Sequence, residues 1–345
     1  MSKRLLILYT GGTIGMQHTE KGLAPAPDLA ANISALIGSG RTLASDPPQL
    51  SVQTVDPLID SSDMRPGNWI ELAGRIESVY DQYDGFVVLH GTDTLAYTSS
   101  ALSFFIQKRG KPVIVTGAQL PFGYPRSDAR SNLISAVEVA ATLPEHLTQV
   151  CVVFGSRILR GNRATKISAR AYDAFASPRV GELGRIGIDI EFQGQQGAPL
   201  PLPVNARALS IPADDAVVLL RLYPGISANI LRLICQDTNL QALIIEAYGS
   251  GNGPVSDPAF TAAIREAIAK GIVVLVVSQP LDGVVHFDRY AAAHEFAGAG
   301  AVSGLDITPE AAVTKLYYLI AAGYDSREIK DILSVSLAGE MHLPS

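Results

Sequence analysis

Charged side chains are scarce in this sequence of 345 residues, of which 17% are Asp, Glu, Lys or Arg and 47% are hydrophobic. So apolar a composition excludes a disordered chain and is ample for one large or two ordinary globular domains. The 27 basic and 33 acidic side chains leave a net charge of -6, and the main basic cluster is Lys108, Arg109 and Lys111. We therefore expect no nucleic-acid partner.

Long hydrophobic runs and cysteine-rich patterns are also missing. An apolar run such as Ile272–Val277 is far shorter than the roughly 20 apolar residues that a membrane-spanning helix needs. The run Leu5–Tyr9 near the start is too short for the apolar region of a secretory signal. Cys151 and Cys235 both have apolar neighbours and no metal-binding spacing. These absences predict a cytoplasmic protein with reduced thiols and no contact with a membrane.

What the chain does contain is an alternation of short Val-, Ile- and Leu-rich runs with helical patterns. This alternation is typical of parallel strands covered by helices on both faces. In the first half we expect strands at Arg4–Tyr9, Leu50–Val55, Gly85–His90, Pro112–Thr116 and Val150–Phe154, with helices at Asp28–Ile37 and Asn68–Tyr80. In the second half we expect strands at Ala216–Leu222, Ala242–Ala247 and Ile272–Ser278, with helices starting at Ser227, Asp257, Thr308 and Asp325.

The alternation is interrupted between Gly181 and Pro212, where Gly, Gln and Pro dominate and no helical or strand period is seen. The sequence therefore predicts two α/β domains of unequal size. Residues 1–190 form the larger, a doubly wound and mostly parallel sheet with the catalytic loops. Residues 191–213 connect the domains, and residues 214–345 form the smaller α/β domain.

Ligands of open α/β sheets bind beyond the carboxyl ends of the strands, so the loops there are the candidates for chemistry. The first is Thr10–Gly15, TGGTIG, which could be a phosphate-binding loop or a structural turn. It is neither G-x-G-x-x-G nor a P-loop. Its glycines would also let the backbone approach a small ligand closely while Thr13 presents its hydroxyl.

The second candidate loop, Leu89–Thr94, places Thr92, Asp93 and Thr94 directly after an apolar strand. Thr and Asp at such a position also cap helices, and this is the interpretation we prefer for Thr94. Two hydroxyl-rich loops at neighbouring strand ends would instead face one cleft, which favours a functional role for Thr92 and Asp93. His90 ends the buried run and is expected to be a core histidine.

The third candidate, Arg160–Lys166, again follows a strand, and we expect Arg160 and Arg163 on a solvated face. A threonine hydroxyl is a poor nucleophile at neutral pH and needs a base or relay within hydrogen-bond reach. Lys166 together with Thr92 could supply that relay for Thr13. Asp93 beside Lys166 would favour the ammonium and burial would favour the neutral amine, so the charge of Lys166 stays open.

These segments match a known family. YTGGTIGM, PLIDSSDM, GFVVLHGTDTLAYTSSALSF, KPVIVTGAQLP and RGNRATK together resemble the bacterial-type L-asparaginases, in particular their cytoplasmic type I branch. The resemblance runs from about Leu5 to Glu340 and implies a larger N-terminal and a smaller C-terminal α/β domain. It implies hydrolysis of L-asparagine to L-aspartate and ammonia without a cofactor or metal, and it leaves a minor glutaminase activity open.

The resemblance also implies a role for each site residue. Thr13 would attack the side-chain amide carbon and form a β-aspartyl ester that water then cleaves, assisted by Thr92, Asp93 and Lys166. Asp93 would accept the α-ammonium group of the substrate, and the α-carboxylate would bind at the turn formed by Asp60, Ser61 and Ser62. Backbone amides near Gly12 or Gln119 are natural donors to the developing oxyanion.

Family members assemble as an intimate dimer or a dimer of dimers, with sites formed between subunits. The resemblance therefore implies self-association and makes Asn252, in YGSGNG, a contact to the substrate of the neighbouring subunit. The runner-up to an active enzyme is a catalytically weak amino-acid-binding or regulatory homologue.

The sequence departs from the family at two places. Leu23 stands where many members have a tyrosine that bonds to the nucleophile, and Tyr290 resembles a tyrosine that replaces it in mammalian-like type I members. A tyrosine at a helix start that serves only packing is the alternative for Tyr290. In the effector pocket of allosteric members, Glu246 and Pro280 replace an Arg and a Cys, so we expect hyperbolic kinetics.

Overall fold

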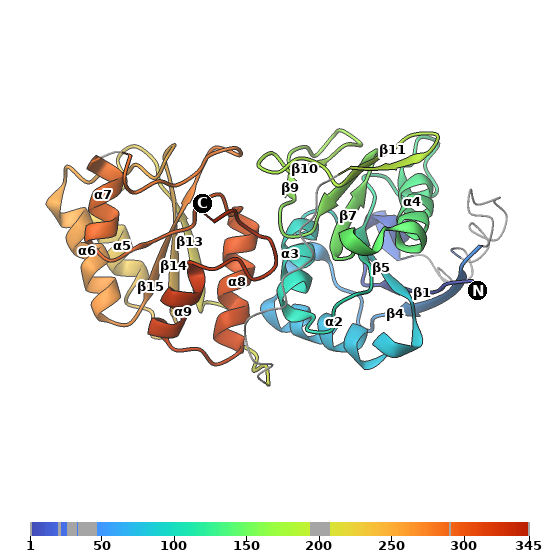
Figure 1. Ribbon diagram of the computed structural model, residues 1–345, viewed down its shortest axis with the longest axis horizontal. Helices are drawn as coiled ribbons and strands as arrows, with labels where there is room; N and C mark the ends of the chain where they lie inside the picture. Colours follow the sequence, from blue (N-terminus) through green and yellow to red (C-terminus); the bar gives the residue numbers. More distant parts are fainter. Residues whose placement is uncertain are drawn as a thin grey trace. The chain divides into compact units, whose positions relative to one another are not determined.

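The computed structural model describes residues 2–19, 22–25, 33, 47–193, 208–289 and 291–343. The chain divides into two compact units, Met1–Pro199 and Leu200–Ser345 (Figure 1). Each unit has its own sheet, with helices on both faces. The boundary falls among residues 194–207, which lie outside the described residues, so the connection expected at 191–213 is described only at residues 191–193 and 208–213 and stays a prediction.

The described part of the first unit is built on an eight-stranded sheet in the order β12-β11-β8-β7-β6-β5-β1-β4. Its parallel strands are β1 (Arg4–Tyr9), β4 (Gln49–Thr54), β5 (Gly85–Leu89), β6 (Val113–Thr116) and β7 (Val150–Phe154). These are the five strands expected from the sequence, with ends that differ by at most one residue. Antiparallel strands extend one edge, namely β8 (Arg157–Arg160), β11 (Gly184–Ile186) and β12 (Ile190–Phe192).

Helices cover both faces of this sheet. Leu133, Ala136 and Ala140 of α4 (Ala129–Thr142) pack in one buried cluster with Leu5 and Val87. The helices α2 (Pro66–Ser78) and α3 (Leu95–Phe105) lie on the opposite face of the sheet (Figure 1). On this face Phe86 of β5 stacks on Tyr80, which follows α2, with ring centroids 5.6 Å apart. The expected helix Asp28–Ile37 lies outside the described residues, apart from the buried Ile33.

Short elements complete the described part of the first unit. They are the hairpin of β2 (Met16–Thr19) and β3 (Gly22–Pro25), the pair β9 (Thr165–Lys166) and β10 (Phe175–Ala176), and the 3-10 turns Thr13–Gly15, Ser61–Asp63, Tyr80–Gln82 and Glu145–Leu147. The sequence shows no strand period between Gly181 and Pro212, and the prediction of an irregular stretch there was wrong at its start. The stretch from Gly181 contains β11 and β12, each only three residues long, and so short a strand shows no period of two in the sequence.

The second unit has a four-stranded parallel sheet in its described part, ordered β13-β14-β15-β16. The strands are β13 (Val217–Arg221), β14 (Ala242–Ala247), β15 (Val273–Ser278) and β16 (Val302–Ser303), and the helices are α5 (Ala228–Ile234), α6 (Pro258–Ala269), α7 (Ala291–Gly298), α8 (Pro309–Ala321) and α9 (Ser326–Leu333). Residues of α5, α6 and α7 share a buried cluster with one sheet face. The mostly parallel sheet and the smaller α/β sheet confirm the expected fold class.

The helix starts predicted in the second unit are also found. The Asp257 carboxylate accepts from the Ala259 amide, and the Thr308 hydroxyl accepts from the Ala311 amide. Asp325 accepts from two amides at the start of α9. These bonds satisfy backbone donors that a helix leaves unpaired at its first turn.

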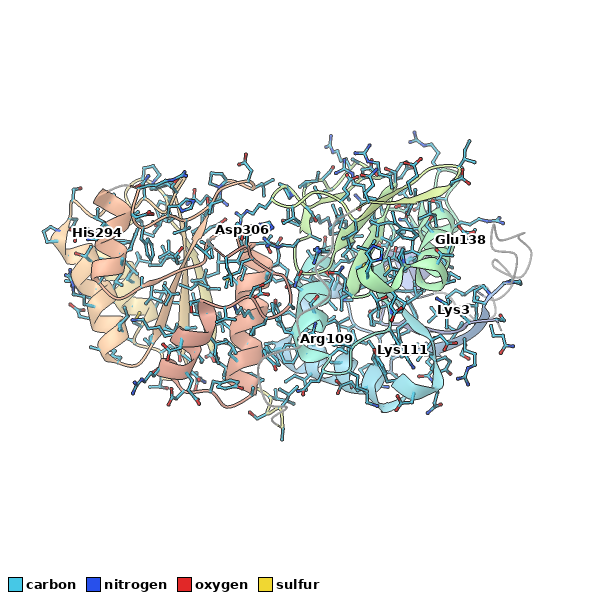
Figure 2. All side chains as sticks on the ribbon, viewed as in Figure 1. Lys3, Arg109, Lys111, Glu138, His294 and Asp306 are labelled. Atoms are coloured by element: carbon cyan, nitrogen blue, oxygen red, sulfur yellow. The ribbon has the colours of Figure 1, made fainter. Side chains whose placement is uncertain are left out.

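The basic cluster noted in the sequence lies between α3 and β6, where Arg109 and Lys111 are labelled in Figure 2. The Lys111 ammonium donates to the Tyr80 and Tyr83 carbonyls at 2.7 Å each, and Lys108 pairs with Asp81 at 3.0 Å. These cations therefore fasten neighbouring turns to each other. Across the described ranges, no helix combines the length and the apolarity that crossing a membrane requires.

Candidate active site

The two threonine loops meet where the order of the large sheet reverses. β1 is second from one edge of the sheet, with the edge strand β4 paired on one side and β5 on the other, and the chain passes from β1 to β4 before it returns to β5. Tyr9 at the end of β1 is level with Leu89 at the end of β5. Such a switch point is where open α/β sheets bind their ligands, so Thr13 and Thr92 follow the two strands that frame it.

Glycines let these loops touch. Gly12 has a φ of 87°, a conformation unfavourable for side-chain-bearing residues, and a Cβ there would lie 2.3 Å from the Gly91 nitrogen. A Cβ on Gly91 would in turn lie 2.4 Å from the Ser61 Oγ. The loops that carry Thr13 and Thr92 are therefore packed backbone against backbone, and the Ser61 side chain lies against Gly91. The close approach of a small ligand, which the sequence led us to expect from these glycines, stays a prediction.

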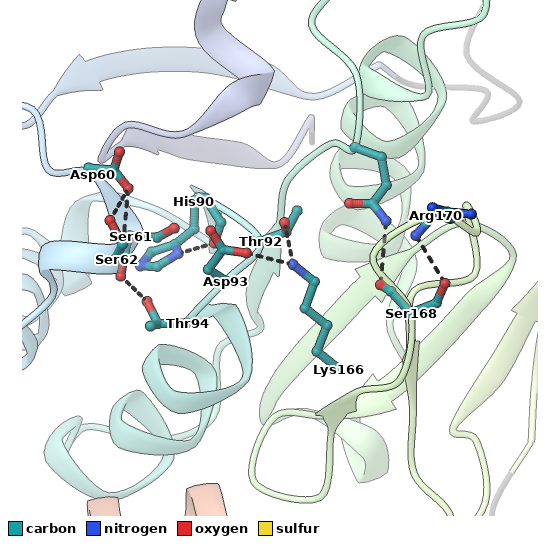
Figure 3. A network of polar contacts seen from close by, with 12 residues as sticks. Asp60, Ser61, Ser62, His90, Thr92, Asp93, Thr94, Lys166, Ser168 and Arg170 are labelled. Atoms are coloured by element: carbon teal, nitrogen blue, oxygen red, sulfur yellow. Dashed lines mark hydrogen bonds and ion pairs between the residues drawn. The ribbon is translucent and has the colours of Figure 1, made fainter.

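Lys166 joins the second and third candidate loops (Figure 3). Its Nζ donates to the Asp93 Oδ1 at 2.8 Å and to the Thr92 Oγ1 at 2.9 Å. The Lys166 side chain is 21% exposed, whereas that of Asp93 is 67% exposed. Two oxygens therefore hold the Lys166 Nζ, and the Asp93 carboxylate is the more exposed partner of the pair. Thr92 accepts from Lys166, so the Thr92 hydroxyl proton is free to be donated elsewhere.

The turn after β4 is held by its own polar groups. The Asp60 Oδ1 accepts from the Ser62 amide at 3.0 Å and the Ser62 hydroxyl at 2.9 Å, and these two bonds lower the pKa of Asp60. Both donors of Ser62 are therefore occupied. Ser61 is buried, and within the described chain its hydroxyl bonds to no other group. Ser61 is thus the side-chain donor of this turn that a ligand could use.

Thr94 and the two arginines of the third loop differ from expectation. Thr94 precedes α3 without capping it; its hydroxyl donates instead to the Ser61 carbonyl at 2.6 Å and ties the two loops together. The solvated face expected for Arg160 and Arg163 is wrong. Arg163 is only 2% exposed, and the Arg160 guanidinium donates to the Gln149 Oε1 at 3.2 Å. Arg160 is the last residue of β8 and is half-buried, and Arg163 follows this strand and is buried.

His90 is a satisfied core histidine, as expected. It is 1% exposed, its Nδ1 lies 2.7 Å from the Gly91 carbonyl oxygen and its Nε2 lies 3.0 Å from the Thr98 Oγ1. Burial lowers the pKa of His90 to about 4. The ring is therefore neutral at physiological pH, with its proton on Nδ1 because only a donor there can bond a carbonyl.

Asp128 and Asn132 shape the loop after β6, and no motif in the sequence marks them as site residues. Asp128 accepts from the amides of Gln119 and Leu120 at 3.0 Å, and Asn132 donates to the Gly117 carbonyl at 2.9 Å. The only signal in the sequence is an Asp at the start of a helical period, which predicts an ordinary helix cap. Here the carboxylate turns away from its own helix and holds the neighbouring loop.

Three further residues named from the sequence lie in the second unit or have side chains outside the described residues. Tyr290 is outside the described residues. Leu23 lies in β3, and its side chain is not described. Asn252 belongs to the second unit, where its amide and carbonyl close a turn with Tyr248 at 2.8 and 2.9 Å. The Asn252 Oδ1 is buried without a hydrogen-bond partner among the described residues.

Glu246 and Pro280, which stand where allosteric members of the family have their effector-binding Arg and Cys, are also in the second unit. Glu246, on β14, is 8% exposed in its side chain and pairs with Arg221 of β13 at 3.1 Å. The carboxylate is therefore engaged by a cation of its own domain. Hyperbolic kinetics stays a prediction.

The described ranges contain no cluster of three His, Cys, Asp or Glu side chains arranged to hold a metal ion. The cluster at the switch point instead combines hydroxyls, a carboxylate and an ammonium. A two-domain α/β fold with such groups at the carboxyl ends of its strands defines a hydrolytic type of site.

Comparison with known proteins gives the family. The family model described as "Asparaginase, N-terminal" matches residues 4–197, and that described as "Glutaminase/Asparaginase C-terminal domain" matches residues 216–333. L-asparaginase 1 of Escherichia coli K12 is 40% identical over 98% of each chain. The 60 kDa lysophospholipase of Mus musculus is 39% identical over 99% of this chain, which spans 63% of that protein.

Solved structures agree. The crystal structure of L-asparaginase I from Vibrio cholerae O1 superposes with a TM-score of 0.89 at 38% identity, covering 99% of this chain and 100% of that one. The thermostable L-asparaginase from Thermococcus kodakarensis gives 0.83 at 31% identity, covering 98% and 99%. The chain therefore belongs to the asparaginase family, as the sequence resemblance predicted.

Proposed function

We propose that this protein is an L-asparaginase, which hydrolyses L-asparagine to L-aspartate and ammonia in two displacements through an ester on Thr13. The observation that supports this most is the contact of the Thr13 loop with the Thr92 loop at the switch point, next to the Lys166 pair. The relatives named L-asparaginase point to the same substrate. We further propose that no cofactor or metal takes part, and that glutamine is at most a minor substrate.

In the first displacement the Thr13 Oγ bonds to the amide carbon and loses its proton, while the carbon–nitrogen bond breaks. Thr92 is placed to donate a proton to the departing nitrogen, because its hydroxyl accepts from Lys166 and keeps its own hydrogen free. Lys166 then restores the Thr92 proton and takes up in its place, through a water molecule, the proton that left Thr13, so that ammonia departs and the ester on Thr13 remains. In the second displacement water attacks the ester carbon, aspartate leaves and the Thr13 hydroxyl is regenerated.

The same residues suit a zwitterionic substrate. Lys166 occupies only the Oδ1 of Asp93, and the exposed carboxylate retains acceptor positions for the substrate α-ammonium. The α-carboxylate is assigned to the turn that follows β4. Ser61 would donate its free hydroxyl, and Asp60 would hold Ser62 and the turn in place.

We also propose self-association as an intimate dimer or a dimer of dimers, in which Asn252 contacts the substrate of the neighbouring subunit. The buried Asn252 Oδ1, which lacks a partner among the described residues, supports a role beyond its own turn. Light scattering of the purified protein tests this assembly, and a monomer would contradict it.

We propose that the Tyr290 hydroxyl replaces that of the tyrosine missing at Leu23. We also propose a cytoplasmic location for the protein.

The experiment for the activity is ammonia release from L-asparagine and L-glutamine. Wild type should turn over asparagine, and Thr13→Ala and Thr92→Val should each lose at least roughly 10³-fold in kcat, since they remove the nucleophile and its relay. Background turnover by folded wild type would favour the amino-acid-binding homologue. Full activity in Thr13→Ala would assign the nucleophile to another group.

Tyr290 and Asn252 need separate readouts. Tyr290→Phe should lower kcat about 10- to 100-fold if its hydroxyl moves a proton, and unchanged kcat would leave this ring a packing role. Asn252→Ala should raise KM, and mixing it with inactive Thr13→Ala should restore some activity if sites are completed across subunits. No recovery in the mixed dimers would place Asn252 outside the neighbouring site.

A further inference from the structure

A chain of hydrogen bonds runs from the core of the first unit to the backbone next to Thr92. The Trp69 Nε1 donates to the Thr98 Oγ1 at 3.2 Å, and the Thr98 hydroxyl donates to the His90 Nε2 at 3.0 Å. The His90 Nδ1 donates to the Gly91 carbonyl at 2.7 Å. Within this chain the His90 Nε2 accepts a hydrogen bond and the His90 Nδ1 donates one, so His90 adopts a single tautomer. The chain therefore has a fixed direction, and it ends on one peptide unit.

Every member of the chain is rigidly held. Trp69 lies on α2 and is 5% exposed, Thr98 lies on α3 and is 0% exposed, and His90 is 1% exposed. Fully buried side chains that satisfy one another lose little freedom on ligand binding and keep one geometry. Two helices thus set the orientation of the imidazole, and the imidazole sets the orientation of the Gly91 carbonyl.

The peptide unit at the end of this chain joins Gly91 to Thr92. In a trans peptide the carbonyl and the N–H point in opposite directions. With the Gly91 carbonyl aimed at the buried ring, the Thr92 N–H points away from the core, toward the side where Thr92 and Asp93 are accessible. Within the described chain, no oxygen accepts a hydrogen bond from this N–H. A backbone donor is therefore left aimed at the cleft.

The same peptide lies against the nucleophile loop. A Cβ on Gly12 would come within 2.4 Å of the Gly91 Cα and 2.8 Å of the His90 carbonyl carbon. Gly12 directly precedes Thr13, so the amide of the substrate, once attacked, has its oxygen near this peptide. Preorganised backbone donors at the point where negative charge develops are among the largest single contributions to acyl-transfer catalysis.

We propose that His90 is a positioning residue of this enzyme, which holds the Gly91–Thr92 peptide with its N–H toward the oxygen of the reacting amide. The inference rests on the proposed amide hydrolysis. His90 itself moves no proton in this role, in agreement with its burial. Trp69 and Thr98 act through His90, because they fix the ring that the carbonyl contacts.

Substitutions at His90 test this role because they can keep or remove one bond at a time. His90→Asn retains an amide N–H near the Nδ1 position, and His90→Leu fills the space without a donor. We expect His90→Leu to lower kcat about 10- to 100-fold, the loss typical of a misplaced reacting group, with KM changed less than about threefold. His90→Asn should retain kcat within about threefold of wild type.

Coupling to Thr98 separates positioning from general damage. Thr98→Val should lower kcat about two- to fivefold in wild type, because the ring loses its second anchor, and should add nothing in the His90→Leu background. Val137→Ala, on α4 at the other sheet face and 1% exposed, is the matched core control. It should lower the melting temperature without changing kcat at 25 °C.

Two outcomes would overturn the inference. One is wild-type kcat in folded His90→Leu, and the other is an equal loss of kcat in His90→Asn and His90→Leu. A folded wild type that releases no ammonia would instead overturn the proposed function, and this arm of the experiment is read first. Activity of wild type together with an equally active His90→Leu would overturn the positioning role alone.

Discussion

Two lysine–carboxylate pairs with the same nitrogen–oxygen distance, 2.8 Å, lie one in each unit. Lys166 and Asp93 are 21% and 67% exposed, whereas Lys315 and Glu340 are both 0% exposed. The first pair lies at the switch point, where the carboxylate is open to solvent. The second ties α8 to Glu340 near the C-terminus. Pairs of equal length thus differ in accessibility, and accessibility decides which of them could serve the proposed reaction.

The buried pair is surrounded by further donors and acceptors. Glu340 accepts from the amides of Leu337 and Ala338 at 3.0 and 2.8 Å, and Lys315 donates to the Val335 carbonyl at 2.6 Å. Burial alone would raise the pKa of Glu340, but Lys315 and these amides outweigh it and hold this pKa below its ordinary value. The carboxylate therefore stays ionised inside the protein.

Removing Lys166, the lysine of the accessible pair, should have the largest effect, and this effect should fall on catalysis. Lys166→Met takes the proton source from Thr92, so we expect kcat to fall about 10³- to 10⁴-fold, equivalent to about 4–5 kcal/mol of barrier. The free energy of unfolding should change by less than about 1 kcal/mol, because an exposed pair contributes little to stability. Steady-state kinetics with urea denaturation measures both, and near-normal kcat would contradict the assignment.

Removing the buried lysine should reverse this pattern. Lys315→Met leaves Glu340 without its cation, so we expect the free energy of unfolding to fall by about 3–4 kcal/mol, while kcat of the folded enzyme stays unchanged. Urea denaturation measures the loss. Lys315→Met combined with Glu340→Gln removes the unpaired charge and should recover part of it. A loss below about 1 kcal/mol in the single variant would show that the pair is not needed for stability.

His90 gives a third case, a buried titratable group without an ionic partner. Its pKa in the folded protein is about 4, against 6.5 as its ordinary value. As the pH falls below 6.5 the unfolded chain gains a proton that the folded protein takes up only near pH 4. The free energy of unfolding should therefore fall by up to about 3 kcal/mol across this window.

His90→Asn is the control for that pH dependence, because other acidic groups also titrate there. The free energy of unfolding of wild type minus that of the variant, measured by urea denaturation from pH 7 to 4, gives the contribution of His90 alone. A difference that does not vary with pH would mean that the His90 pKa is not depressed in the folded state.

The smallest effect should come from a pair on the surface of α2. Arg75 and Glu71 lie 2.6 Å apart but are 41% and 52% exposed. Arg75→Gln should lower the free energy of unfolding by only about 0.3–0.5 kcal/mol, and the difference should shrink in high salt. Thermal unfolding at low and high ionic strength measures it. A loss above about 1 kcal/mol would show that exposure does not decide the strength of these pairs.

Most of the fold was predictable because its strands are buried and regular. The apolar runs Arg4–Tyr9, Val150–Phe154 and Ala242–Ala247 gave strands with the expected ends. The short antiparallel strands β11 and β12 were not predictable, since three residues are too few to show a period. Arg163 was misassigned for a related reason: a charged residue appears exposed in sequence, and only its neighbours bury it.

For the candidate site, the sequence named residues but not the contacts between them. Thr13, Thr92, Asp93 and Lys166 were named from the sequence, and the contacts of Lys166 join three of them. Neither the bond from Thr94 to Ser61 nor the chain that runs through His90 to the Gly91 carbonyl left any sequence signal. Each depends on residues that lie far apart along the chain.

The sequence by itself determined the family, the two α/β units and the two threonine loops, because local patterns and short motifs encode strands, turns and reactive groups. Only the tertiary structure decided which of the two lysine–carboxylate pairs is accessible and which is buried. Burial is a property of all the neighbours of a residue together, and packing of distant segments sets it. For the same reason, the order of strands around β1 decided that the two threonine loops share one switch point.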